Sequence, residues 1–479
     1  MAEKAKAPEL PRQLQWVNTD KPPDIAKCRG KVVLIYFWTP SNFNSRALLL
    51  DIRALENRHE NGVVVIGIVC PKYPRECTPA SIQKAINRHF IRHPVALDSD
   101  FTLWQQYGVR SWPSAAVIDA EGQLRLLTEG DDAGEALDEA VDALLDEAAS
   151  KDIRDYTQLA AARRSEPAGL LKFPTAILPA RGHVYISDSG NNRILEVSEK
   201  GRLIRVFGSG NPGFWDGALD NSGFNFPQGL SVTENYLYVA DTGNHAIRRI
   251  NLFTGEVETV MGTGKAAKTM TLAETNLREI GCNSPVGLAS KGPDLYISMA
   301  GSHQLWRLDL KNSQVSWHSG SGQLGLINGE RAKAAFACPM GLTVHGDVLL
   351  VADADSSAVR EVNIKTGDIS TRTGRGTYTF GCEDGGRANA LMQFPCDVAL
   401  SLNREQLWIA DTYNSRIRLL DLASNRLTTP AIDYEFSEPT YLTVYDHALW
   451  VADSNAHQIL QVHLADRSVK PFDVVETSL

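Results

Sequence analysis

The sequence predicts a chain of two domains, an α/β domain followed by an all-β propeller of six blades. Two observations support this prediction. The first 150 residues alternate continuous apolar runs with segments of helical periodicity, whereas the rest of the chain repeats one strand-rich pattern six times. A length of 479 residues is enough for two or more domains with hydrophobic cores of their own.

The α/β domain is predicted from the order of its segments. KVVLIYFW (31–38) and GVVVIGIVC (62–70) are continuous apolar runs, as expected of strands buried on both faces of a sheet. The segment between them, 45–60, has apolar residues at helical spacing. A second helical segment and two further strands follow, and the acidic stretch 129–147 has leucines and a valine on one helix face. We therefore expect a sheet covered by helices.

The propeller is predicted from six copies of one pattern, which begins as a short apolar strand and continues through a polar turn into a second strand. The copies are 183–197, 236–250, 294–308, 348–362, 406–420 and 448–462. Each copy follows a proline and a short apolar run, the prolines being Pro174, Pro227, Pro285, Pro339, Pro395 and Pro439. Each unit therefore has four short strands, which cannot bury both faces unless the units pack face to face in a ring.

The copy V-A-D-T-G-N-H-A-I-R at 239–248 resembles the NHL repeat. Five copies keep the acid of this pattern, as Asp188, Asp241, Asp353, Asp411 and Asp453, while Met299 replaces it in the third copy. We interpret these acids as turn residues that accept backbone N–H bonds. Some NHL-type propellers are zinc-dependent lyases, but His245, His303 and His457 stand at the repeat's own histidine position, so we predict no metal.

Four of the connections between units are long, and their residues are 207–227, 262–285, 320–339 and 374–395. In a four-stranded blade, the link to the next blade emerges on the same face as the turn between the second and third strands. We therefore expect the long loops to share a face with the Asp-x-x-Asn turns. This face is a candidate binding surface; the alternative is that the loops only close the top of the ring.

The first domain resembles the thioredoxin-like fold over residues 10–148. F-W-T at 37–39 precedes the first helix, where that fold keeps its active-site turn, and Trp112-Pro113 falls where it carries a cis-proline. A thioredoxin-like domain, a linker helix and lead-in at 149–172 and an NHL propeller at 173–475 together resemble the NHL repeat-containing protein 2 family. Animal members carry a further β domain, so this sequence resembles a shorter, bacterial-type version.

The resemblance implies a Cys-x-x-Cys pair after F-W-T, but Asn42 and Ser45 occupy the two cysteine positions, with Ser41 just before them. An amide and an unactivated hydroxyl cannot exchange disulfides. Both can accept hydrogen bonds from the N–H groups at a helix start, so the turn can keep its shape. We therefore predict a redox-inactive turn and a partner-binding surface made of Trp38, Ser41, Asn42, Phe43, Ser45, Trp112 and Pro113.

The predicted function is a non-enzymatic platform that binds a protein or peptide at the cleft between the domains or on the long-loop face. Two enzymatic alternatives stay open: a thiol oxidoreductase that uses Cys70, with Cys77 nearby, and a metal-dependent lyase or hydrolase in the propeller channel. No sequence pattern indicates a cofactor.

Composition indicates the compartment and the class of partner. A net charge of -9 argues against nucleic acid or an anionic membrane as the main partner. The N-terminus lacks the apolar core of a signal peptide, and no apolar run reaches the roughly 18 residues of a membrane span. Seven scattered cysteines, an odd number with no Cys-x-x-Cys, predict a cytoplasmic protein with free thiols.

Overall fold

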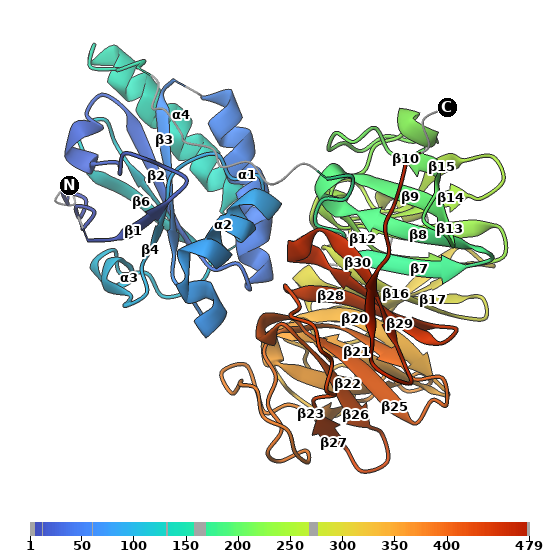
Figure 1. Cartoon of the computed structure of the whole chain (residues 1–479). Coiled ribbons are helices and arrows are strands. Elements are labelled where there is room, and N and C mark those ends of the chain that lie inside the picture. Colours follow the sequence, from blue (N-terminus) through green and yellow to red (C-terminus); the bar gives the residue numbers. More distant parts are fainter. Residues whose placement is uncertain are drawn as a thin grey trace. The chain divides into compact units, whose positions relative to one another are not determined.

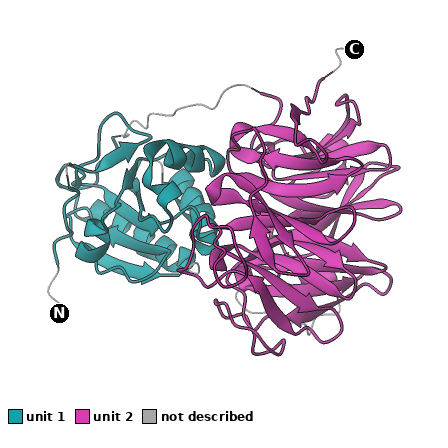
Figure 2. Cartoon of the chain, turned by 60° about the horizontal axis from the view of Figure 1, so that its bottom comes forward, with its two compact units in different colours: residues 1–167 teal, residues 168–479 magenta. Residues whose placement is uncertain are grey.

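The computed structural model describes residues 5–11, 13–59, 61–130, 133–157, 169–267 and 276–476. The chain divides into two compact units, Met1–Pro167 and Ala168–Leu479, which Figure 2 shows in teal and magenta. Part of the predicted linker at 149–172 lies outside the described residues. Among the described residues, no helix is both long enough and apolar enough to cross a membrane.

The first unit is built on one six-stranded sheet with the order β1-β4-β3-β2-β5-β6. Its strands are β1 (Gln15–Val17), β2 (Val32–Trp38), β3 (Val63–Val69), β4 (Val95–Leu97), β5 (Ser114–Ile118) and β6 (Leu124–Glu129). The central strand β2 runs parallel to β3 and antiparallel to β5. All seven residues of β2 are buried, which confirms the prediction of a strand covered on both faces.

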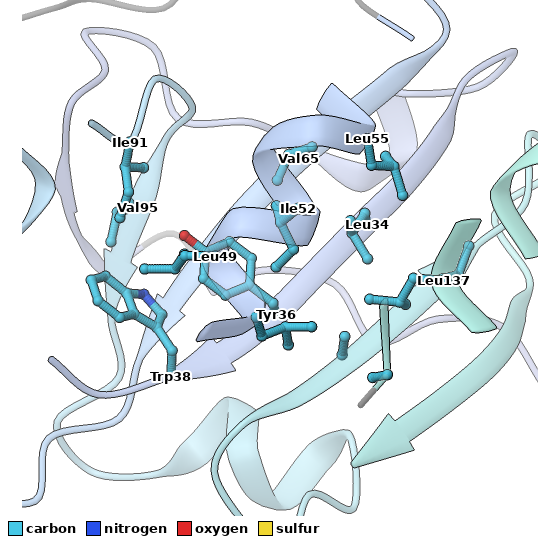
Figure 3. Close-up of a cluster of buried hydrophobic side chains, with 14 of the residues drawn as sticks. Leu34, Tyr36, Trp38, Leu49, Ile52, Leu55, Val65, Ile91, Val95 and Leu137 are labelled. Carbon is cyan, nitrogen blue, oxygen red and sulfur yellow. The ribbon is translucent and has the colours of Figure 1, made fainter. Parts of the chain in front are cut away.

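The helices of this unit are α1 (Phe43–Arg58), α2 (Pro79–Arg88), α3 (Thr102–Gln106) and α4 (Gly134–Ser150). The apolar stripes of α1, α2 and α4 pack on one face of the sheet, and Figure 3 shows Leu49 and Ile52 of α1 beside Tyr36 of β2. The other face is covered by α3, the short 3-10 helix η1 (Ile25–Lys27) and the segment 5–16. The thioredoxin-like unit therefore includes residues before position 10.

The second unit is a six-bladed propeller, as predicted, and Figure 1 labels most of its strands. Blade 1 has β7 (Ala176–Ala180), β8 (His183–Asp188), β9 (Arg193–Ser198) and β10 (Leu203–Phe207). Blade 2 has β12 (Pro227–Val232), β13 (Tyr236–Asp241), β14 (Ala246–Asn251) and β15 (Glu256–Met261). The short strand β11 (Gly217–Ala218) pairs with β15. Blade 3 has β16 (Pro285–Lys291), β17 (Asp294–Met299), β18 (Gln304–Asp309) and β19 (Gln314–Ser319).

Blade 4 has β20 (Pro339–His345), β21 (Val348–Asp353), β22 (Ala358–Asn363) and β23 (Ile369–Thr373). Blade 5 has β24 (Pro395–Leu400), β25 (Gln406–Asp411), β26 (Arg416–Asp421) and β27 (Arg426–Thr428), and blade 6 has β28 (Pro439–Tyr445), β29 (Ala448–Asp453), β30 (Gln458–His463) and β31 (Val469–Pro471). The first strand of each blade contacts the first strand of the next, and β28 contacts β7, so the ring is closed.

The repeated aspartates are buried acceptors, as predicted. Asp241 accepts the backbone N–H of Asn225 at 2.8 Å and the side-chain amide of Asn244 at 2.8 Å. Asp411 makes the equivalent bonds in blade 5. The backbone donor lies 16 residues before Asp241 and 18 before Asp411, so each of these aspartates fixes the segment that leads into its own blade.

In five of the six turns, the residue at the histidine position connects one blade to the next. His245 Nδ1 of blade 2 accepts the backbone N–H of Ser284, which leads into blade 3, at 3.0 Å. Asn192 does the same for Phe226, and His457 for Phe173, a bond that joins blade 6 to blade 1. His245 and His457 therefore use their Nδ1 lone pairs for blade-to-blade bonds and not for a metal.

We predict that His245→Ala lowers the free energy of unfolding by about 1–3 kcal/mol, because the buried Ser284 N–H loses its acceptor. His245→Asn should cost much less, because Asn192 fills this position in blade 1 with the same left-handed backbone (φ 48°). Urea unfolding of the two variants measures the difference. Equal losses for Ala and Asn would contradict the assigned bond.

The same bond should depend on pH. Burial lowers the pKa of His245 to about 4. In the unfolded chain the His245 imidazole binds a proton near pH 6.5, whereas in the folded chain it does not. The contribution of His245 to the free energy of unfolding is therefore complete above pH 6.5 and is lost as the pH falls toward 4. His245→Asn should therefore flatten the pH dependence of unfolding in this range.

Candidate functional site

The turn between β2 and α1 keeps the shape expected of a helix start. Asn42 is the N-cap of α1, and its side-chain Oδ1 accepts the backbone N–H of Ser45 at 2.8 Å. Asn42 therefore accepts a backbone N–H at the start of α1, as expected of this residue type. Ser45 is buried, and its Oγ has no hydrogen-bond partner in the described part of the chain. The second cysteine position is thus filled by a hydroxyl that makes no bond there.

Glu76 holds this turn, and the sequence analysis did not single it out. It lies in the 3-10 helix η2 (Pro74–Cys77) and is almost completely buried. Its carboxylate accepts the Thr39 hydroxyl at 2.7 Å and the Ser41 backbone N–H at 2.8 Å. Further bonds come from the backbone N–H groups of Lys72 (2.9 Å) and Tyr73 (3.0 Å). The turn is therefore tied to the loop after β3 by one carboxylate.

The electrostatics of Glu76 fit a structural role. Burial raises the pKa of the carboxyl, while the bonds from Thr39, Tyr73 and Ser41 lower it. No ion pair of Glu76 occurs among the described residues. The signal that could have identified it is an acid in the loop C-P-K-Y-P-R-E-C, directly after a buried strand that ends beside F-W-T. A buried acid without a cation needs several donors, and the adjacent turn provides them.

The Trp112-Pro113 peptide bond is cis, as the resemblance predicted. Phe37 of β2 pairs with Ser114 of β5, so the turn after β2 and the residues before β5 lie at the same edge of the sheet. The sequence-predicted site residues therefore come together, but most of them are buried. Trp38, Ser41, Phe43, Ser45 and Pro113 are inside, and only Asn42 and Trp112 are partly exposed. Of the predicted surface, those two remain able to contact a partner.

An aromatic cluster extends this edge. The Trp112 ring lies 5.0 Å from Trp104 and 6.2 Å from Phe101, measured between centroids, and all three side chains are partly exposed. The backbone N–H groups of Arg110, Ser111 and Trp112 make no hydrogen bond within the described residues. The edge thus offers apolar rings beside free backbone donors.

Cys70 sits in an environment that disfavours a thiolate. It is fully buried, and its thiol donates to the Asp98 carboxylate at 3.7 Å. Burial and the Asp98 charge raise the pKa of Cys70 well above its usual range. Cys77 is mostly exposed. The part of its side chain that is shielded from water, together with the charge of Glu76, raises the pKa of its thiol. Disulfide exchange needs a thiolate of lowered pKa, so neither thiol has the environment of a redox nucleophile.

The inner strands of the propeller contain one buried acid, Asp397 of β24. Blades 2, 3 and 4 have Gly229, Gly287 and Gly341 at this position. The Asp397 side chain packs on Gly341 of blade 4 and accepts the backbone N–H of Leu442 of blade 6 at 2.8 Å. Burial raises its pKa to about 8. Within the described ranges, no three His, Cys, Asp or Glu side chains gather in a group that could hold a metal.

The long loops share a face with the Asp-x-x-Asn turns, as predicted. The Asn244 side chain donates to the Gly213 carbonyl of the first long loop at 2.7 Å, and Asn414 makes the same bond to Gly381. Residues 268–275 of the second long loop lie outside the described residues. The face is therefore formed by loops that are fixed to the turns beneath them.

Comparison with known proteins matches both units. The model of the AhpC/TSA family matches residues 2–127, and the NHL repeat model matches residues 224–250. NHL repeat-containing protein 2 of Bos taurus is 33% identical, over 98% of this chain and 71% of that protein. The Homo sapiens protein is 31% identical with the same coverage. The Arabidopsis thaliana protein SUPPRESSOR OF QUENCHING 1, chloroplastic, is 32% identical over 95% of this chain and 46% of its own length.

We predict that Asp397→Asn removes a pH dependence from the stability of the propeller. The folded chain holds the Asp397 proton up to about pH 8, whereas the unfolded chain releases it near pH 4. Stability therefore falls as the pH rises between these values, by about 1 kcal/mol per pH unit at the steepest. Urea unfolding at pH 6 and pH 8 tests this. The exposed Asp433→Asn is the control, and identical slopes for both variants would refute the assignment.

Proposed function

The chain belongs to the family of NHL repeat-containing protein 2, and on this premise we propose that it is a non-enzymatic platform that binds a protein or peptide. One observation carries the proposal: Asn42 and Ser45 stand where the resemblance implies cysteines, yet Glu76 holds the turn by accepting two hydrogen bonds from it and two from its own loop. The shape of the site is thus maintained by groups that take no part in disulfide exchange.

The binding surface of the first unit is proposed to be the edge at Trp112. An extended peptide could pair with the free backbone N–H groups of 110–112 and place an apolar side chain on the rings of Trp112, Trp104 and Phe101. Main-chain bonds would supply affinity, and the aromatic rings would supply selectivity for apolar or aromatic side chains.

The proposal includes a cytoplasmic location, which the seven free cysteines favour. In the propeller, the loop face is proposed as a second contact surface, because its loops are rigidly attached to the blades and present polar and apolar groups outward. The thiol alternative has no comparable support, since burial and Asp98 oppose ionisation of Cys70.

We predict that the natural chain does not accelerate insulin reduction by dithiothreitol. The double variant Asn42→Cys/Ser45→Cys should accelerate it, because the turn already presents a helix N-terminus that lowers a thiol pKa. The turbidity of reduced insulin measures both rates. Activity of the natural chain that Cys70→Ser abolishes would overturn the redox-inactive part of the proposal in favour of the thiol alternative.

The binding part of the proposal is tested by affinity capture with the full chain. Ser111→Pro removes one exposed backbone N–H, and Trp112→Ala removes the central ring. Both should reduce capture of the same protein at least tenfold, while the exposed Gln106→Ala should not. Thermal unfolding of each variant confirms that it is folded. Capture that is unaffected by both changes would contradict a binding surface at this edge.

A further inference from the structure

Three long loops contain the same structural device, which we call the clip. The clips are Asp216-Gly217, Asn328-Gly329 and Asp384-Gly385, and each glycine pairs with the outer strand of the blade that follows it. Gly329 and Ile369 show the pairing in full: each donates its N–H to the other's carbonyl at 2.9 Å. Each clip therefore covers part of the outer edge of its blade, as the short strand β11 in blade 2 and as a single β-bridge in blades 4 and 5.

A buried arginine and a threonine recognise the clip. In blade 4, Arg360 donates to Asn328 at 3.1 Å and to the carboxylate of Asp353 at 3.1 Å. Thr371 of the outer strand donates to Asn328 at 2.8 Å. Blade 2 makes the same bonds with Arg248 and Thr259, and blade 5 makes them with Arg418 and Thr429. The acid, the arginine and the threonine of a blade thus form one site for the clip.

Blade 3 has lost all three members of that site. Met299 stands in place of the acid, Trp306 in place of the arginine and Trp317 in place of the threonine. Met299 and Trp306 are buried, and Trp306 pairs with Trp317 across strands β18 and β19. The loop before blade 3, 262–285, contains no Asp-Gly or Asn-Gly. The polar site for an internal clip has therefore been replaced by an aromatic pair.

Among the described residues, no segment pairs with the outer edge of β19 at Val315. Val315 pairs with Leu308 as Ile369 pairs with Val362, so its N–H and C=O point outward like those of Ile369. Neither group has a partner in the described part of the chain. In blade 1 the corresponding Leu203 donates to the carbonyl of Val475 at 3.0 Å. In blade 6 the corresponding Val469 also has no partner for these groups among the described residues, but β31 has only three residues and ends in Pro471, which has no N–H. The longer strand β19, unpaired at Val315 within the described residues, is therefore a site for a further strand.

The side chains beside this edge determine which kind of peptide strand can bind there. The Arg331 guanidinium lies 5.1 Å from the centroid of the Trp317 ring and is exposed. No ion pair of Arg331 occurs among the described residues. An incoming strand with an acidic side chain would pair with Arg331, and a neighbouring apolar side chain would lie on Trp317.

We propose that the outer edge of blade 3 binds an extended, acidic peptide segment of a partner protein, which adds as a fifth strand beside Val315. Main-chain bonds to Val315 replace those that the clips of blades 2, 4 and 5 supply internally. This site is separate from the edge at Trp112, so either surface can fail its test without affecting the other.

The test uses the full chain and a random dodecapeptide library displayed on phage. Selected peptides are synthesised, and their affinities are measured by fluorescence anisotropy. We expect them to combine acidic with β-branched or aromatic residues. Arg331→Glu and Val315→Pro should each weaken binding at least tenfold, whereas the exposed Lys333→Glu should leave it unchanged. Hydrogen exchange in 314–319 should slow when peptide is added.

Val315→Pro could disturb the fold of the blade. The Arg331→Glu variant and the exchange measurement on the natural chain therefore test the proposal without relying on Val315→Pro. Failure to select peptides, affinity that is unaffected by Arg331→Glu, or unchanged exchange in 314–319 would each overturn the proposal. Protection of 314–319 without peptide, together with a dimer in sedimentation, would also overturn it, because a second copy of the chain would then occupy the edge.

Discussion

A buried carboxylate that accepts backbone N–H bonds is the interaction on which both units of this protein depend. Glu76 ties the turn at 39–42 to the loop after β3, and Asp241, Asp353 and Asp411 tie the lead-ins of blades 2, 4 and 5 to the second strands of those blades. In each case a buried acid satisfies backbone donors that helices and sheets leave unpaired. These bonds fix the turn beside Trp112 and the loops that lead into blades 2, 4 and 5.

The buried charges of the propeller also explain why blade 3 differs in several residues at once. In blades 2, 4 and 5 the acid and the arginine are both fully buried. Removing one partner of a buried ion pair leaves an uncompensated charge, at a cost of about 3–5 kcal/mol. Met299 and Trp306 together leave no uncompensated charge in blade 3, and Trp317 stands at the position of the threonine that bonds to the clip. Blade 3 is therefore packed without this ion pair, and Val315 at its outer edge has no partner among the described residues.

Much of this architecture could be predicted from sequence. The repeat fixed the number of blades, because a lone four-stranded unit cannot bury both of its faces. The replacement of cysteine by Asn42 and Ser45 was visible directly. Glu76 was not, because its partner Ser41 lies 35 residues away and no local pattern links them. The acceptor role of His245 was missed for the same reason, since Ser284 follows 39 residues later. Burial of Trp38 also required the tertiary packing of α1.

The central claim is that Glu76 holds the turn at 39–42 in place. The most direct measurement is amide hydrogen exchange of the natural chain and of Glu76→Gln, followed at Ser41 and Tyr73. The amide substitution keeps the size of the side chain and replaces one acceptor oxygen with a donor. We predict slow exchange at both amides in the natural chain and exchange at least tenfold faster in the variant, with β2 and β3 unchanged. Equal protection in the two proteins would contradict the claim.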